Sequence, residues 1–139
     1  MKNPLSIILF ASLIAAMVAY YNYHTRRTQR ILDGLNKEYP IISISEAIYG
    51  VVTQIDHPNS NVFRNNPHHA FILITDSIKK RIRTGFEISK RLTLDEVLKE
   101  GDLVIKESGN DFLSIYKIHG NDTLKYDFEL SDDLGYPLK

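Results

Sequence analysis

The sequence predicts a mainly β protein in which an N-terminal transmembrane helix precedes a small antiparallel OB-like β-barrel with one short helix. Three observations predict this class: an uncharged apolar stretch at residues 5–23, alternating apolar and polar residues from residue 41 onward, and one helix-capping motif within that alternation. These patterns divide the chain into a transmembrane anchor (1–23), a basic juxtamembrane linker (24–40), a β-barrel domain (41–130) and a flexible tail (131–139).

The apolar stretch has the length and composition of a membrane anchor. Of the 19 residues from Leu5 to Tyr23, 16 are hydrophobic and none is charged. A helix of about 20 apolar residues spans the hydrocarbon core of a bilayer. Tyr20, Tyr21 and Tyr23 gather at one end, where amphipathic rings prefer the headgroup level. We therefore expect a single-pass anchor that contacts the lipid bilayer through residues 5–23.

A cleaved signal peptide is the main alternative to an anchor. Signal peptidase needs small residues at the −1 and −3 positions of its cut site. Cleavage after Ala19 would place Met17 at −3, and cleavage after Ala16 would place Ile14 there. These bulky residues favour an uncleaved anchor. If cleavage did occur, the domain would be periplasmic or exported.

The charges that flank the anchor predict its orientation. Lys2 and the terminal amine precede it, whereas Arg26, Arg27, Arg30 and Lys37 follow it. Acidic residues count little in the positive-inside rule. The excess of basic residues on the C-terminal side favours a cytoplasmic β-barrel domain.

The soluble part shows strand patterns on either side of one short helix. Thr93 and Glu96 form a T-x-x-E capping box, and Gly50 within the first pattern indicates a bend or a close backbone approach. Three strands, a helix and two or three strands follow the order of an OB-fold. An SH3-like barrel stays open, because periodicity does not fix strand pairing. The expected strands are residues 42–56, 70–75, 78–88, 103–107, 112–118 and 123–130, with a loop at 57–69.

One segment carries a resemblance to known sequences. Leu98–Lys106 fits the pattern L-x-x-G-D-x-[IV]-x-K and precedes a terminal hairpin, represented by Phe112–Lys117 and Lys125–Phe128. Together with the anchor and the basic linker, it resembles a group of uncharacterised small bacterial membrane-anchored β-barrel (OB-like) proteins over about residues 44–130. The resemblance implies the fold and the anchoring, and no activity.

The composition argues against several classes of enzyme. The 139 residues include no Cys, which excludes a disulfide framework, a thiol nucleophile and a Cys-ligated zinc site. The G-x-S-x-G, G-x-G-x-x-G and P-loop motifs are also missing from the sequence. We therefore predict a non-enzymatic protein without catalytic residues, cofactor or metal.

Histidines around one loop offer a zinc site as an alternative. Asp56 and His57 begin this region, and His68 and His69 end it. Imidazoles and carboxylates are zinc ligands, but adjacent residues of a strand-like segment point to opposite faces. The pattern favours a solvated surface loop.

The third predicted strand carries a row of basic residues. Alternation predicts that Lys79, Arg81 and Arg83 lie side by side on its outer face. Such a row could contact phosphates, or it could protect an edge strand from aggregation. OB-type barrels bind ligands along the second and third strands and the neighbouring loops. The residues predicted to bind a partner or an anion are Arg64, His68, His69, Lys79, Arg81 and Arg83.

These patterns favour a membrane-tethered binding module whose partner is another protein of a membrane or envelope complex. The alternative is a tethered nucleic-acid or polyanion binder that uses the basic strand. A metal-dependent hydrolase built on the histidine loop ranks third. Salt dependence separates the first two, because counterion release weakens phosphate binding as salt rises.

Overall fold

A computed structural model describes residues 4–56, 66–75 and 78–138 of the chain. The chain forms two compact units, Met1–Leu35 and Asn36–Lys139. Arg64, His57 and most of the predicted loop at 57–69 lie outside the described residues.

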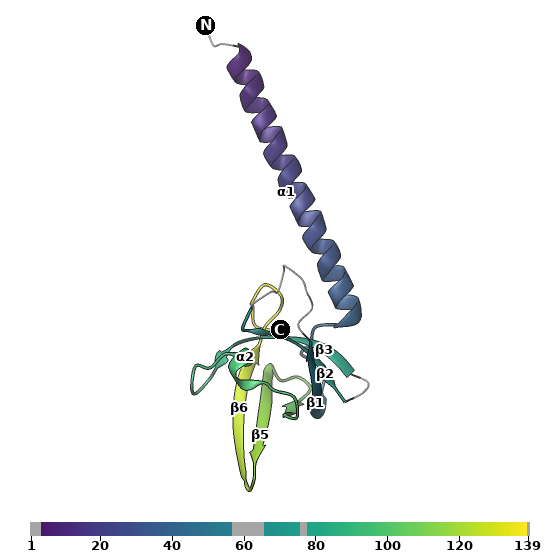
Figure 1. Cartoon of the computed structure of the whole chain (residues 1–139), viewed down its shortest axis with the longest axis vertical. Coiled ribbons are helices and arrows are strands. Elements are labelled where there is room, and N and C mark those ends of the chain that lie inside the picture. The colour runs from purple at the N-terminus through teal and green to yellow at the C-terminus, as the bar shows by residue number, and fades with distance from the viewer. Residues whose placement is uncertain (1–3, 57–65, 76–77, 139) are drawn as a thin grey trace. The chain divides into compact units, whose positions relative to one another are not determined.

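The first unit contains helix α1 up to Leu35, and the helix as a whole runs from Pro4 to Glu38 (Figure 1). Its apolar side chains are exposed along the predicted anchor, and the helix is long and apolar enough to cross a membrane. The hydroxyls of Ser12 and Thr25 donate to helix carbonyls of preceding residues, which satisfies these polar groups within the helix. The basic linker continues the same helix, which ends just before Pro40.

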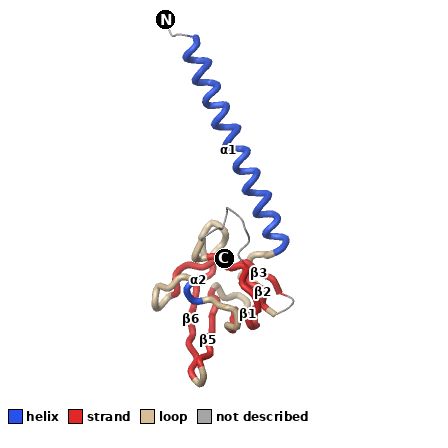
Figure 2. Tube along the Cα trace, viewed as in Figure 1, coloured by secondary structure: helices blue, strands red, loops and turns tan. Residues whose placement is uncertain are grey.

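The second unit is a small antiparallel β-barrel, shown in Figure 2 as red strands joined by tan loops. Its strands pair in the closed order β1-β2-β3-β6-β5-β4, and every pairing between described strands is antiparallel. The short helix lies between the third and fourth strands, as in an OB-fold, although the barrel has six strands where an OB-fold has five. The predicted fold class is confirmed. The elements are β1 (Ile48–Asp56), β2 (His69–Ile74), β3 (Ile78–Glu87), α2 (Leu94–Val97), β4 (Leu103–Lys106), β5 (Phe112–His119) and β6 (Asp122–Leu130).

The barrel interior is filled by apolar side chains from every described strand, with Leu94 of α2 closing one end. The capping box forms as predicted: the backbone N–H and the hydroxyl of Thr93 donate to Glu96 Oε2 at 2.7 and 2.9 Å. Gly50 marks a close approach, because a Cβ there would lie 2.5 Å from Cγ2 of Ile74 on the paired strand.

The first strand starts later than the sequence suggests. Residues 42–47 were expected to be extended, but Ser43 and Glu46 close a turn in which the Ser43 N–H donates to Glu46 Oε2 at 2.9 Å. The buried ammonium of Lys106 holds this turn by donating to the carbonyls of Ile44 and Glu46 at 2.9 and 2.7 Å. Burial lowers the pKa of Lys106. The turn therefore depends on a lysine 60 residues away in sequence.

The predicted alternation in the third strand is wrong at its end. The β3–β6 pairing is irregular between Thr84 and Glu87, so Phe86 is exposed and Glu87 is buried. The Glu87 carboxylate accepts hydrogen bonds from the N–H groups of Ser89 and Lys90. Burial alone would raise the pKa of Glu87, but these hydrogen bonds hold it below its usual range. The carboxylate thereby closes the turn that follows the strand.

The G-D-x-[IV]-x-K segment has a structural role in the barrel. Gly101 has a positive φ of 90° and its N–H donates to the Val52 carbonyl at 2.7 Å. Asp102 Oδ2 accepts from the Lys99 N–H and from Lys117 Nζ, both at 2.7 Å. The segment thus builds the turn between α2 and β4 and ties it to β1 and β5.

We expect the full-length protein to stay in the membrane pellet after carbonate washing, because its exposed apolar helix has no protein core around it. Fractionation followed by N-terminal sequencing checks this. A soluble chain that begins within residues 17–24 would contradict the anchor and support a cleaved signal peptide.

Candidate functional site

The predicted row of basic residues is not an exposed row. Arg81 has 0% exposure, and its Nη2 donates to Asp133 Oδ2 at 2.6 Å and to Asn36 Oδ1 at 2.7 Å. Its backbone is engaged as well: the Arg81 N–H donates to the Pro40 carbonyl at 3.1 Å, and the Ile42 N–H donates to the Arg81 carbonyl at 3.2 Å. The expectation of an exposed Arg81 is wrong. Residues that precede β1 in the chain, and Asp133, which follows β6, cover this part of β3. We call this set of contacts the Arg81 clasp.

The C-terminal tail also covers Arg83. Arg83 Nη1 donates to the Asp133 carbonyl, and a Cβ at Gly135 would lie 2.9 Å from Arg83 Nη2. The Ser131 N–H donates to the Arg83 carbonyl at 2.9 Å. The Leu138 N–H donates to the Leu130 carbonyl at 3.2 Å, which closes the loop. The tail, expected to be flexible, therefore makes a folded loop over the basic part of β3.

Lys79 is the half-exposed member of the predicted row. Its ammonium lies 3.9 Å from the Glu38 carboxylate and 5.5 Å from the centre of the Tyr39 ring. The Tyr39 hydroxyl donates to Asp56 Oδ2 at 2.5 Å, and burial together with this carboxylate raises the pKa of Tyr39 to about 12. These contacts fasten the residues after α1 to β1 and β3.

The two predicted histidines occupy different environments. The His68 ring meets the Phe86 ring edge to face, with centroids 4.9 Å apart. His69 is buried opposite Arg83, and burial together with the charges of Arg83 and Arg81 lowers its pKa to about 3. His69 is therefore neutral at pH 7. Within the described ranges, no group of three His, Cys, Asp or Glu residues is placed to hold a metal.

His69 lines a pocket of about 450 Å³ between β1, β2 and α2. The size falls within the usual range of small-ligand sites, roughly 300–1,000 Å³. Apolar and charged side chains share its wall. The lining residues are Ile55, His69, Ala70, Leu94, Asp95, Leu98, Lys99 and Glu100.

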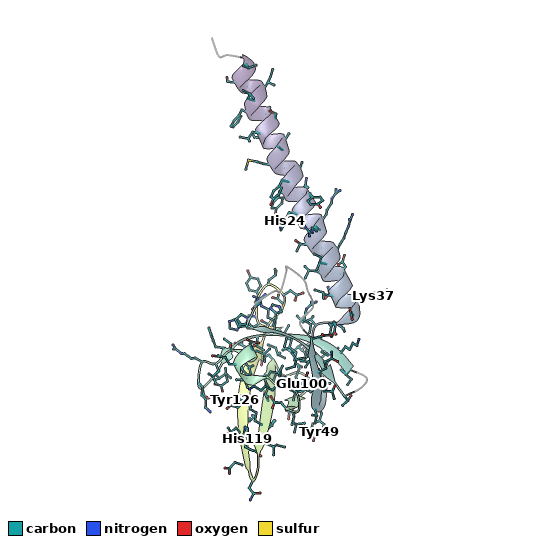
Figure 3. The ribbon with its side chains drawn as sticks, viewed as in Figure 1. His24, Lys37, Tyr49, Glu100, His119 and Tyr126 are labelled. Carbon is teal, nitrogen blue, oxygen red and sulfur yellow. The ribbon has the colours of Figure 1, made fainter. Side chains whose placement is uncertain are left out.

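An apolar surface lies on the outside of β1, β4 and β5. The strand register places Tyr49 beside Ile105, and it places Val51, Leu103 and Tyr116 in one row across three strands. Figure 3 labels Tyr49 on β1 and His119 at the β5–β6 turn; in the register Tyr49 lies in the row of Ile105 and Ser114, and Ile118 lies next to that turn. We define the apolar face as Tyr49, Val51, Leu103, Ile105, Tyr116 and Ile118.

Polar residues border the apolar face on β5 and β6. Lys125 Nζ lies 2.9 Å from Asp127 Oδ1, and the Ser114 hydroxyl donates to the same oxygen at 2.5 Å. Lys125 stands opposite Tyr116 of the apolar face in the register, and Asp127 stands opposite Ser114. A polar rim next to an apolar centre is the usual anatomy of a protein interface.

Neither the pocket nor the apolar face was among the sites predicted from the sequence patterns. The run Ile48–Val52 is apolar on both faces of the strand, and this was the available signal for an outward apolar surface. The pocket depends on how α2 packs against β2, and the alternation of apolar and polar residues does not predict this packing. Comparisons with family models, with curated proteins and with solved structures find no match to this chain.

We expect Asp133→Asn to lower the free energy of unfolding by about 2 kcal/mol, because it leaves the buried Arg81 guanidinium without its charged partner. Urea unfolding of the full chain in detergent, followed by circular dichroism, measures this. Lys79→Met is the matched control, since its half-exposed ammonium should contribute under about 0.5 kcal/mol. Equal effects of the two substitutions would contradict the clasp.

Proposed function

We propose that the protein is a non-enzymatic, membrane-tethered β-barrel that binds another protein of a membrane or envelope complex. The observation that carries this proposal is the apolar face. Tyr49 and Ile118 are 72% and 69% exposed there. Contiguous exposed apolar side chains rimmed by polar residues mark interaction surfaces.

The chemistry of the apolar face supports a protein as the partner. The face carries two tyrosines and four aliphatic side chains and no charge, and tyrosine is enriched in the core of protein interfaces. The neighbouring Lys125 and Asp127 balance each other in an ion pair. This surface therefore suits an apolar protein patch better than a polyanion.

The alternative, a nucleic-acid or polyanion binder, has less support. Binding of phosphates depends on cations that are free to release counterions. The Arg81 guanidinium is buried against Asp133, and Arg83 lies under the tail loop. Phosphate binding by Arg81 and Arg83 would first require the tail to leave.

We further propose that α1 anchors the barrel on the cytoplasmic side of the membrane. The support is the group of arginines between the apolar stretch and the barrel, which the positive-inside rule assigns to the cytoplasm.

Photo-crosslinking in cells tests the proposed interface. A crosslinking amino acid replaces Tyr49 or Ile118, and the matched controls replace Tyr136 and Leu134, which are 65% and 78% exposed on the tail loop. We expect the same single protein to be crosslinked from Tyr49 and from Ile118, and from neither control. Different products from the two positions, or equal yields from the controls, would contradict the proposal.

Binding of the purified partner then measures the contribution of the apolar face. Tyr116→Ser should raise the Kd about tenfold, because Tyr116 lies in the middle row of the apolar face and the loss of such a contact costs more than about 1 kcal/mol. The Kd should change little with salt, whereas a phosphate-binding mode would weaken steeply.

A further inference from the structure

The pocket between β1, β2 and α2 is separate from the apolar face and shares no residue with it. Its floor consists of the buried side chains of Ala70, Leu94 and Leu98, and Ile55 adds an apolar wall. Such a floor accepts an aliphatic chain.

Backbone hydrogen bonds fix the walls of this pocket. The Asp95 N–H donates to the Pro67 carbonyl at 3.0 Å, which ties α2 to the segment before β2. The Leu98 N–H donates to the Leu94 carbonyl at 2.8 Å and ends the helix. The backbone on the α2 side of the pocket is therefore held by internal hydrogen bonds.

The rim of the pocket is acidic. Asp95 and Glu100 contribute carboxylates and Lys99 contributes one ammonium, so the rim has one net negative charge. Glu100 Oε1 accepts from the Ile55 N–H at 3.4 Å, which keeps this carboxylate beside the end of β1 (Figure 3). The neutral His69 adds no charge to the pocket. At pH 7 the polar part of the pocket thus offers more acceptors than donors.

We propose that this pocket binds an aliphatic cation, with its alkyl chain on the Leu94–Leu98 floor and its ammonium between the carboxylates of Asp95 and Glu100. This chemistry belongs to a lysine side chain and to a free alkylamine alike. Charge-assisted hydrogen bonds to carboxylates hold the head group, and the apolar floor holds the chain. The site is independent of the partner proposed for the apolar face.

NMR spectroscopy of the full-length protein in zwitterionic lipid nanodiscs tests this site. Methyl signals of Ile55, Leu94 and Leu98 are followed while Nα-acetyl-lysine methylamide is added. Nα-acetyl-norleucine methylamide, which has a similar chain without the charge, is the matched probe. We expect saturable shifts with the lysine probe and about tenfold weaker binding of the norleucine probe.

A double variant with Asp95→Asn and Glu100→Gln should weaken binding of the lysine probe about tenfold. The control Glu129→Gln, which changes an exposed carboxylate on β6, should leave this binding unchanged.

Tighter binding of the lysine probe than of n-butylammonium would identify a peptide side chain as the ligand, and the reverse order would identify a free amine. Absent shifts, equal binding of the norleucine probe, or an equal effect of Glu129→Gln would overturn the proposal. Unchanged methyl spectra of the variants before titration confirm that they are folded.

Discussion

The buried guanidinium of Arg81 is the constraint on which the arrangement of the barrel unit depends. A charge without water costs several kcal/mol unless it is paired and hydrogen-bonded. Asp133 and Asn36 meet this requirement from opposite ends of the unit, and the backbone of Arg81 pairs with Pro40 and Ile42. A single residue of β3 therefore joins the last turn of α1, the residues that follow it, the barrel and the C-terminal tail.

This constraint also affects where the protein can bind a partner. The clasp and the tail loop use Arg81 and Arg83 for internal contacts, so these two cations stabilise the fold. The opposite side of the barrel is different, because there Tyr49, Val51 and Ile118 of the apolar face are exposed. The separate pocket beside α2 adds a small acidic and apolar site. The protein thus presents an uncharged surface and a compact pocket where the sequence suggested a basic stripe.

Much of the fold could be predicted from local patterns, while the sites could not. The alternation, the capping box of Thr93 and Glu96 and the apolar stretch are local signals, and each produced the expected element. Alternation places Lys79, Arg81 and Arg83 on one side of a strand but does not report what covers that side. The burial of Arg81 depends on Asp133, which is 52 residues away in sequence. The alternation of apolar and polar residues carries no information about contacts between residues so far apart in sequence.

Amide hydrogen exchange of the full chain with Arg81→Met tests the central role of the clasp most directly. We expect the amides of Ile42, Ser131 and Leu138 to lose protection together, because the clasp and the adjoining tail hold both ends of the barrel unit. The amides of β4 and β5 should keep their protection, since their pairing does not involve Arg81. Unchanged protection at Ile42 and Leu138, or an equal loss of protection in β4 and β5, would contradict the central role of the clasp.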